Sequence, residues 1–392
     1  MKTIVIWGAG KIGRGPAAEV FQGIGWHIVF VRRNPEFVRA MRDAGQYTIV
    51  RSEQGKERHI TTIHGYEVYS TDETEALADA VVRADLVMAP VMWHQLAEVA
   101  QQLVPGLLRR REQRPNDTLD ILSCANMVNS ALHMTEALRQ ALPADALEYL
   151  DQKVGVVETL ARVTAIDPPP EDVRPEDPAM VYTRTPGLLH IDQDAFKGPI
   201  PSGPGLVPVH DPATEGMLKL WFGNLGHEGL SYRGWLRGHE FVHQCAADPV
   251  VAADVQAAMR EAAPALVADG RIQAEDAERQ IDALPERLNN PAFGDPVARS
   301  ARDPVRKLGR NDRFVGPLLL ARRYGLPFPY LARTVACVLL YDAPKDKESV
   351  YVQQRIREIG MRAAVFELCS LGADEADVVD AVLEQVEMLK KA

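Results

Sequence analysis

The fold is decided by the stretch Thr3-Ile4-Val5-Ile6-Trp7-Gly8-Ala9-Gly10-Lys11-Ile12-Gly13, close to the start of the chain. Its first five residues are rich in β-branched side chains, which is typical of a buried parallel strand. The glycines that follow have the spacing GxGxxG, which indicates a dinucleotide-binding turn when a strand precedes it and a helix follows. Residues 12–21 have a helical pattern, and residues 27–31 form a second apolar, strand-like run. The sequence therefore predicts a right-handed βαβ unit.

Each glycine of this turn has a distinct physical role. Gly8 permits the tight turn, Gly10 lets a pyrophosphate approach the backbone, and Gly13 allows the helix to pack closely on the strand. The N-terminus of the helix offers free N–H groups and the positive end of its dipole to phosphate. The alternative is an ordinary glycine-rich turn without a ligand. We expect the dinucleotide to contact Gly8, Ala9, Gly10, Lys11, Ile12 and Gly13.

The end of the second strand indicates which dinucleotide binds. NAD-preferring sites carry Asp or Glu at this place to hold the ribose 2′-hydroxyl. This chain has Arg32 and Arg33 instead, with no acid. A guanidinium suits a 2′-phosphate through paired, charge-assisted hydrogen bonds. We therefore expect NADP to be preferred over NAD; the alternative is that both arginines are solvated surface charges.

Further strand candidates extend the βαβ unit into a sheet. Residues 86–89 and 120–123 are apolar runs that each precede a helical stretch. This alternation predicts parallel strands in a doubly wound sheet. Added strands are expected at residues 47–50, 65–69, 181–183 and 188–191, the first two of them antiparallel.

We place a domain boundary near residue 205, after a run rich in proline and glycine. From residue 211 onward the pattern is helical and rich in Ala, Leu, Glu and Arg. The predicted fold class is α/β. Residues 1–205 are expected to form a Rossmann-type, doubly wound, dinucleotide-binding domain with added strands. Residues 206–392 are expected to form an all-α substrate and catalytic domain.

The composition excludes several classes of protein. Of the 392 residues, 46% are hydrophobic and 25% are charged, which excludes a disordered, collagen-like or coiled-coil chain. The formal net charge of -10 argues against a general nucleic-acid or anionic-membrane binder. The four cysteines stand far apart, as is typical of reduced thiols in a cytoplasmic protein. No apolar run is long enough to predict a membrane span.

A second constellation is Lys219-x4-Asn224-x2-His227. On an α-helix, offsets of five and eight residues rotate by about 140° and 80°, so the three side chains can converge. A partly desolvated lysine has a lowered pKa and can remove a hydroxyl proton. Asn224 and His227 can hold the oxygen as negative charge develops on it. The alternative is a surface lysine with a capping asparagine and a packed histidine.

Six longer segments follow one another along nearly the whole chain. They are GAGKIGRG at 8–15, CANMVNSALHM at 124–134, FKGPIPSGPG at 196–205, KLWFGNLGHEG at 219–229, DPVRKLGRNDRFVGPLL at 303–319 and RRYGLPFPYL at 322–331. In sequence and in order they resemble the long-chain polyol-specific dehydrogenases, which are the mannitol dehydrogenase family.

The resemblance implies a metal-independent oxidoreductase that interconverts a sugar alcohol, phosphorylated or not, and its ketose by hydride transfer to or from NAD(P). It implies that Lys219 is the general base and that Asn224 and His227 hold the oxygen. Asn126 would lie beside the nicotinamide or the substrate. The only partner implied is this small molecule, and the chain would be a monomer or a homodimer.

The chain departs from the family pattern at three places. Arg32 stands where the family carries Asp, and Leu160-Ala161-Arg162-Val163 lacks the acid of the family's Val-Asp-Arg-Ile. Trp93 and His94 follow the third parallel strand, where the family has a turn of small residues. We expect these two rings to border the cofactor or substrate pocket.

A basic stretch stands out in this acidic chain and contains Arg302, Arg306, Lys307, Arg310 and Arg313. One interpretation is an anion clamp for a phosphate or carboxylate of the substrate. The alternative is a helix face paired with Asp303 and Asp312. The expected substrate-binding residues are therefore Asn126, Lys219, Arg306, Lys307 and Arg310.

Three other functions remain open at this point. His239-Glu240-Phe241-Val242-His243 matches HExxH, which binds zinc when both histidines lie on one helix face, but no third ligand is evident. We expect no metal. A reductase of a sugar acid of the hexuronate type, or a dinucleotide-binding sensor without turnover, would share the same N-terminal turn.

Overall fold

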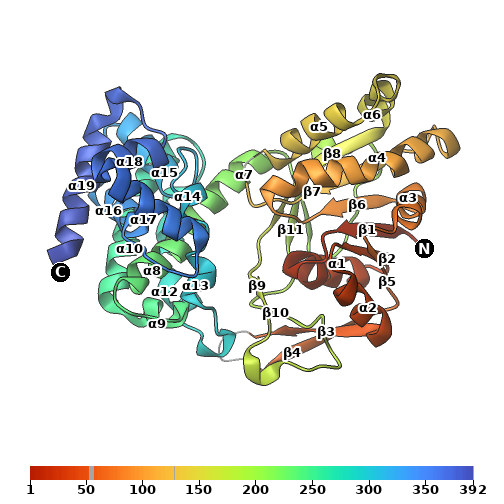
Figure 1. The fold of residues 1–392 in the computed structure, drawn as a ribbon, viewed down its shortest axis with the longest axis horizontal. Helices are drawn as coiled ribbons and strands as arrows, with labels where there is room; N and C mark the ends of the chain where they lie inside the picture. Colours follow the sequence, from red (N-terminus) through yellow and green to blue (C-terminus); the bar gives the residue numbers. More distant parts are fainter. Residues whose placement is uncertain (53–56, 128, 392) are drawn as a thin grey trace. The chain divides into compact units, whose positions relative to one another are not determined.

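The computed structural model describes residues 1–52, 57–127 and 129–391. The chain divides into two compact units, Met1–Gly216 and Met217–Ala392 (Figure 1). Strand β12 (Leu206–Val209) pairs with β11 (Leu189–Asp192), so the sheet of the first unit continues beyond residue 205. The division itself falls between Gly216 and Met217.

The first unit contains an eight-stranded sheet with the order β12-β11-β8-β7-β6-β1-β2-β5. Strand β1 lies between β2 and β6 and is parallel to both. The order therefore reverses at β1, and the turn that follows β1 leaves the sheet at this switch point. Besides β11 and β12, its strands are β1 (Thr3–Trp7), β2 (His27–Arg32), β5 (Glu67–Ser70), β6 (Leu86–Ala89), β7 (Leu119–Ser123) and β8 (Val154–Ala161).

The Rossmann-type, doubly wound sheet predicted from the sequence is confirmed. One strand prediction is wrong: β5 runs parallel to β2, with Val29 opposite Glu67, and not antiparallel. Because α2 (Pro35–Ala44) and the hairpin after it carry the chain back across the sheet, the next strand enters in the same direction as β2.

A second sheet has the order β4-β3-β10-β9. Strand β3 (Gln46–Arg51) pairs antiparallel with β4 (His59–His64) and parallel with β10 (Val181–Thr183), which in turn pairs with β9 (Ala165–Ile166). The sequence did not predict β4, because its His-Ile-Thr-Thr-Ile-His pattern leaves most of its side chains exposed.

Two apolar cores cover the two faces of the main sheet. Val5 and Trp7 point to one face and Ile4 and Ile6 to the other, as the two-residue period of a strand requires. The first core includes residues of α3 (Thr74–Arg83), α4 (Leu96–Gln113) and α5 (Ser130–Ala141). The second core includes residues of α1 (Ala18–Gly23) and α2. A short helix, α6 (Leu147–Lys153), precedes β8.

The second unit is built of helices, as the sequence predicted. Helix α10 packs against α16, and α16 packs against α19. Buried faces such as that of Leu331, Val335 and Val338 form its core. Helix α7 (Pro212–Leu218) spans the chain division. The α-helices after it are α8 (Leu225–Trp235), α9 (Val242–Ala247), α10 (Pro249–Ala268), α11 (Ala274–Asp282), α12 (Leu284–Leu288), α13 (Val297–Ser300), α14 (Pro304–Lys307), α15 (Val315–Arg323), α16 (Pro329–Leu339), α17 (Lys347–Ile359), α18 (Met361–Leu368) and α19 (Ala376–Lys391).

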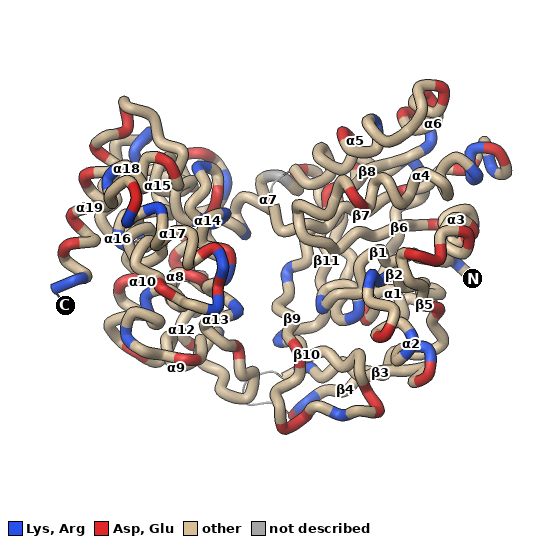
Figure 2. The backbone as a smooth tube through the Cα atoms, in the orientation of Figure 1, with Lys and Arg blue, Asp and Glu red and all other residues tan. Residues whose placement is uncertain are grey.

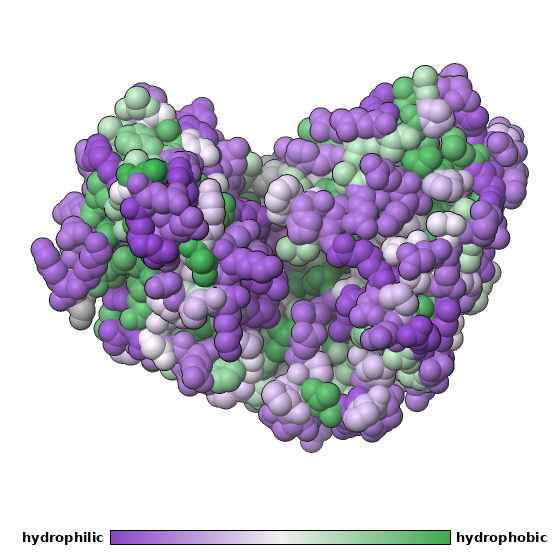
Figure 3. All heavy atoms as spheres, viewed as in Figure 1, coloured by the Kyte–Doolittle hydropathy of each residue, from purple (hydrophilic) through white to green (hydrophobic). Residues whose placement is uncertain are grey.

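Charge is dispersed over both units. Basic and acidic residues both occur in each unit and are interspersed along the chain (Figure 2). Hydrophilic residues also cover most of the face shown in Figure 3, with hydrophobic residues in small groups. Within the described part of the chain, no helix combines the length and the apolar character needed to cross a bilayer.

Candidate active site

The turn after β1 has the shape that a dinucleotide needs. The N–H groups of Gly8 and Ala9 both donate to the carbonyl of Val31, at 3.1 and 3.0 Å, so the turn is tied to the end of β2. Gly8 has a φ of 122°. A Cβ at Gly13 would lie 2.4 Å from the Gly8 carbonyl, whereas one at Gly10 would meet nothing nearer than 4.0 Å. Gly8 and Gly13 are therefore needed for the turn itself, and Gly10 leaves an open approach to the backbone.

The helix after the turn is not the continuous α-helix expected over residues 12–21. Residues Gly13–Ala17 form a π-helical segment, and Gly15 inside it has non-helical dihedrals. Pro16 cannot donate an N–H, and β10 packs so closely that a Cβ at Gly15 would lie 3.0 Å from Val181. Short π segments of this kind are frequent at functional sites.

Arg32 and Arg14 meet beside this turn. Nη1 of Arg32 donates to the Ala9 carbonyl at 2.9 Å, and Nη1 of Arg14 donates to the same oxygen at 3.1 Å. Both guanidinium groups also contact the Phe37 ring, at 4.6 and 5.1 Å from its centroid. Burial lowers the pKa of Arg32, an effect that Arg33 adds to and Asp167 opposes. Two cations thus lie together at the end of β2, where an acid would hold a ribose hydroxyl.

Neighbouring charges complete this cationic region. Arg33 is exposed and pairs with Glu98 at 3.4 Å. Lys11 pairs with Asp167 at 2.7 Å, and Arg14 lies 3.6 Å from the same carboxylate. Asp167 follows β9, far along the sequence, so its place beside the turn was not predictable from a local motif.

The loop after β7 carries Asn126, which is exposed. Asn129 in the same loop has a φ of 59°, a left-handed conformation that asparagine tolerates better than most residues. The buried carboxylate of Glu158 on β8 accepts the Ser130 hydroxyl at 3.0 Å and the Ala131 N–H at 2.7 Å. These bonds oppose the rise in the pKa of Glu158 that burial causes. Glu158 therefore anchors the start of α5, four residues after Asn126 in the chain.

Trp93 and His94 follow β6 and are both exposed, with their rings 5.6 Å apart. Val91, two residues before Trp93, packs so closely on the glycine turn that a Cβ at Gly8 would lie 2.7 Å from it. The two rings are thus attached to a segment that touches the glycine turn. Their part in binding stays a prediction.

In the helical unit, Lys219 and Asn224 lie on a π-helical segment, Lys219–Asn224, that leads directly into α8. The sequence predicted α-helical geometry here. A π-helix closes hydrogen bonds between residues five apart, so it brings Lys219 and Asn224 to the same side one turn apart. The segment is fixed by Phe222, which is fully buried, and by Trp221, whose indole N–H donates to the Asn311 carbonyl at 3.0 Å.

His227 lies in the first turn of α8 and contacts a buried acid. Its Nε2 is 3.2 Å from Oδ2 of Asp295, which also accepts a bidentate ion pair from Arg299. Burial would raise the pKa of Asp295, but the hydrogen bonds from His227 and Arg299 lower it well below its ordinary range. The carboxylate is therefore ionised.

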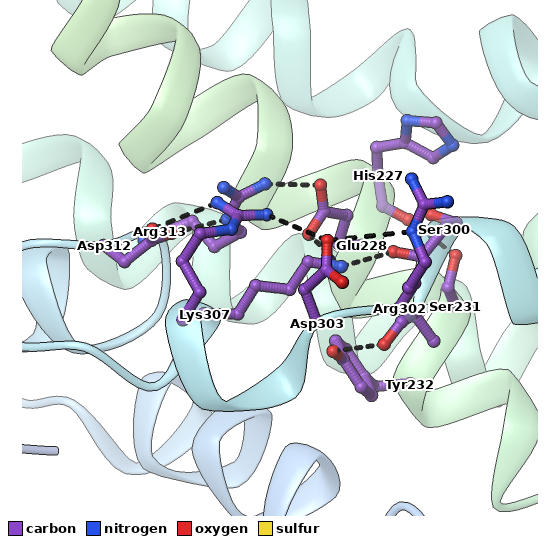
Figure 4. Close-up of polar contacts among 12 residues, drawn as sticks. His227, Glu228, Ser231, Tyr232, Ser300, Arg302, Asp303, Lys307, Asp312 and Arg313 are labelled. Atoms are coloured by element: carbon purple, nitrogen blue, oxygen red, sulfur yellow. Dashed lines mark hydrogen bonds and ion pairs between the residues drawn. The ribbon is translucent and has the colours of Figure 1, made fainter. Parts of the chain in front are cut away.

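Glu228, the next residue of α8, is the centre of a second charged cluster (Figure 4). Its carboxylate pairs with Lys307 at 2.9 Å and with Arg313 at 2.5 Å. Lys307 is 3% exposed and also donates to the Ser300 carbonyl, and Arg313 is fully buried and pairs with Asp312. Burial by itself would raise the pKa of Glu228, but the positive charges of Arg313 and Lys307 lower it to about 2.

The basic stretch is thus extensively ion-paired. Arg306 lies 3.3 Å from Asp312 and 3.9 Å from Asp303, the two acids that the alternative interpretation named. Arg310 makes a bidentate pair with Glu375, at 2.7 Å to each oxygen. The anion clamp of Arg306, Lys307 and Arg310 stays a prediction.

The HExxH segment does not present two histidines on one helix. His239 and Glu240 precede α9, which begins at Val242, and His239 pairs with Asp248 at 3.0 Å. Among the residues that the structure describes, no group of three His, Cys, Asp or Glu side chains is arranged to hold a metal ion.

Two family models together cover nearly the whole chain. Residues 2–202 match the mannitol dehydrogenase Rossmann domain, and residues 216–389 match the mannitol dehydrogenase C-terminal domain. The chain belongs to the mannitol dehydrogenase family. A curated family member, mannitol-1-phosphate 5-dehydrogenase of Streptococcus mutans, is 30% identical over an alignment of 394 positions that covers 99% of this chain and 100% of that protein.

Solved structures show the same family fold. Pseudomonas fluorescens mannitol 2-dehydrogenase, in a ternary complex with NAD and D-mannitol, has a TM-score of 0.81 at 17% identity, over 99% of this chain and 92% of that one. A substrate-free D-sorbitol dehydrogenase has a TM-score of 0.77 at 14% identity, over 99% of this chain and 93% of that one. At these identities the likeness concerns the fold.

In this member of the mannitol dehydrogenase family, four acidic residues that support the candidate site were not predicted from the sequence. Each is distant in sequence from the group that it supports, and none stands in a short motif. Only Glu228 had a feature in the sequence that points to such a role. It follows His227 directly, and the basic stretch later in the chain contains cations with which it can pair. The four are Glu158, Asp167, Glu228 and Asp295.

We predict that Glu228→Gln lowers the free energy of unfolding by about 3–5 kcal/mol, because Lys307 and Arg313 lose the charge that they enclose. Glu367→Gln is the control: it pairs with Arg355 at the surface, and the contribution of such solvent-exposed ion pairs to stability is small. Chemical denaturation measures both variants. Equal losses in the two would contradict the central role of Glu228.

The ion pairs of Glu228 also predict that the free energy of unfolding depends on pH in the acidic range. The pKa of Glu228 is about 2 in the folded state, below its ordinary value of 4.5. Its contribution is therefore complete above about pH 4.5 and is lost as the pH falls towards 2. The decline in stability over this range is expected to be shallower in Glu228→Gln than in the unaltered chain.

Proposed function

We propose that this protein is an NADP-preferring dehydrogenase that interconverts a phosphorylated sugar alcohol and the corresponding ketose. The observation that carries the proposal is the arrangement of Lys219, Asn224 and His227 over one π-helical turn and the start of α8, in a family member with an intact dinucleotide turn. Polyol–ketose interconversion with a nicotinamide cofactor is the chemistry of the relatives named above.

The residues of the glycine turn fit a dinucleotide, and a bound nicotinamide supplies the hydride acceptor for oxidation. The chain's own side chains then handle the proton. Nζ of Lys219 takes the proton of the reacting hydroxyl, so that hydride leaves from a carbon with an alkoxide-like oxygen. Asn224 and His227 hold that oxygen as its charge develops. In the direction of reduction, Lys219 returns the proton to the oxygen.

We predict that Lys219→Ala lowers kcat for polyol oxidation by about 10²–10⁴-fold, the usual loss for a general base. Dinucleotide affinity is expected to stay within a factor of about two, because the lysine acts on the substrate. In the unaltered chain, oxidation is expected to rise with pH, because the unprotonated amine is the active form. Asn224→Ala and His227→Ala, each tested alone, are expected to lower kcat less than Lys219→Ala does. Near-normal turnover in Lys219→Ala would contradict the mechanism.

The preference for NADP is inferred from the charges beside the glycine turn. Arg32 replaces the expected acid, and its guanidinium is fixed between the Ala9 carbonyl and the Phe37 ring. Arg14 adds a second positive charge to the same place. A 2′-phosphate would gain charge-assisted hydrogen bonds there, whereas the unphosphorylated ribose would not.

We predict that Arg32→Asp reverses the cofactor preference. Removal of the cation costs the 2′-phosphate about 1.5–3 kcal/mol, and the new carboxylate can accept the ribose hydroxyls. Fluorescence titration with NADPH and NADH measures the change. Arg33→Asp is the matched control, because Arg33 is the exposed neighbour and pairs with Glu98. Loss of preference in the control, or no change in Arg32→Asp, would contradict the assignment.

The phosphate on the substrate is inferred from the curated relative and from the basic stretch of the helical unit. Of the three clamp candidates, Lys307 is enclosed by Glu228 and Arg310 is held by Glu375. Arg306 has the longest ion-pair distances of the three, 3.3 and 3.9 Å. We therefore assign the main contact with the substrate anion to Arg306.

We predict that Arg306→Ala raises KM for mannitol 1-phosphate by about tenfold or more, the loss of one charged contact, while KM for mannitol changes little. Arg310→Ala is expected to have a smaller effect. Arg322→Ala, which removes a surface arginine paired with Asp377, is the control. If Arg306→Ala changes the KM of both substrates equally, Arg306 is not the anion contact.

A further inference from the structure

Asp295 is a buried acid whose carboxylate faces His227. The side chain of Asp295 is 2% exposed and that of His227 is 17% exposed, and Oδ2 lies 3.2 Å from Nε2. Arg299 donates from Nε to Oδ1 at 2.6 Å and from Nη2 to Oδ2 at 2.7 Å. One carboxylate therefore accepts from a guanidinium and from the imidazole at the same time.

The backbone holds Asp295 independently of His227. Its carbonyl accepts the Val242 N–H at 2.9 Å, and the Val297 N–H donates to the Glu240 carbonyl at 2.9 Å. Phe241 and Pro296 form an isolated antiparallel bridge between these two contacts. The segment that contains HExxH thus acts as a backbone clip that fixes the loop before α13.

An ionised carboxylate at this place has two effects on the imidazole. It fixes the rotation of the ring, and it keeps a proton on Nε2 by accepting it in a hydrogen bond. A carboxylate that holds a catalytic histidine in this manner sets both its tautomer and its direction. Arg299 supplies the charge that keeps Asp295 ionised while it is buried.

We propose that Asp295 is the positioning residue of the reaction, which accepts Nε2–H of His227 and favours the imidazolium form, so that the ring has one orientation and its Nδ1–H donates to the substrate oxygen. This inference rests on the proposed function, because it requires that His227 contacts the substrate. Asp295 itself contacts no substrate. Its carboxylate acts through His227, and Arg299 acts through Asp295.

The chain contains a matched control for the pair. Asp248 accepts from His239 Nε2 at 3.0 Å and from Arg237 Nε at 2.7 Å, which is the same combination of imidazole, guanidinium and carboxylate. Asp248 begins α10 and has no part in the proposed reaction. Asp248→Asn therefore tests for a general effect of breaking such a pair in this unit.

The first test is a double-mutant cycle on kcat for mannitol 1-phosphate oxidation. Asp295→Asn removes the negative charge and replaces one acceptor oxygen with an NH₂ donor, so the side chain can no longer accept the bidentate pair from Arg299 and hold the His227 imidazole as a carboxylate does. We expect kcat to fall at least about tenfold, with KM within about threefold of the starting value. In a His227→Ala background the same substitution is expected to have no further effect, and Asp248→Asn is expected to keep kcat.

The second test does not depend on turnover. In the cofactor-free protein, ¹⁵N NMR of labelled histidine reports which ring nitrogen of His227 carries the proton. We expect Nε2 to be protonated in the unaltered chain and in Asp248→Asn, and the protonated fraction at Nε2 to fall in Asp295→Asn. If Asp295→Asn does not fold, Arg299→Lys, which keeps the charge but breaks the bidentate contact, is expected to give the same changes at smaller amplitude.

Three results would overturn the inference. They are an unchanged His227 ring signal in Asp295→Asn, an undiminished effect of Asp295→Asn in the His227→Ala background, and an equal loss of kcat in Asp248→Asn. A separate result would contradict the proposed function first. If His227→Ala keeps normal turnover, His227 is not part of the reaction, and the positioning role of Asp295 fails with it.

Discussion

The ion pairs of Glu228 are the constraint on which the helical unit's site depends. Its carboxylate lies one residue after His227 and is enclosed by Lys307 and Arg313, both buried. Three buried charges are tolerable only when each has a partner in good geometry. The start of α8 is thereby fixed relative to α14 and the loop that follows it. The same turn of α8 carries His227, so the ion pairs of Glu228 also fix the backbone from which that imidazole projects.

The central part of the fold could be predicted from the sequence, because its signals are local. Strand β1, the glycine turn and β2 are adjacent in the chain, and their apolar runs and spacing are enough to predict the βαβ unit. The parallel direction of β5 could not be read in this way, since it depends on how α2 and a hairpin return the chain to the sheet. Strand β4 was not predicted from the sequence, because its side chains are largely exposed and polar.

Within the candidate site of the helical unit, only the residues of the Lys219-x4-Asn224-x2-His227 motif could be predicted from the sequence. Lys219, Asn224 and His227 share a short spacing, but the π-helical turn that aligns the first two has no sequence signal of its own. The acids that support the site are remote from it along the chain: Asp295 for His227, and Glu158 for the loop of Asn126. Such pairs form by tertiary packing, which a pattern of single residues does not encode. The ion pairs of the basic stretch could not be predicted for the same reason, because the acids that pair with Arg310 and Lys307, Glu375 and Glu228, lie elsewhere in the sequence.

The central claim is that hydride is transferred from a secondary carbon of a phosphorylated polyol to the nicotinamide, while Lys219 takes the proton of the hydroxyl on that carbon. The most direct test follows the hydrogen itself. The full chain is incubated with NADP⁺ and mannitol 1-phosphate deuterated at C5, and the reduced cofactor is examined by NMR. The account predicts one deuterium at C4 of the nicotinamide ring for each ketose formed, and a rate of deuterium transfer that falls about 10²–10⁴-fold when Lys219 is replaced by Ala. Ketose formation without deuterium in the cofactor, or an unchanged rate of transfer in Lys219→Ala, would contradict it.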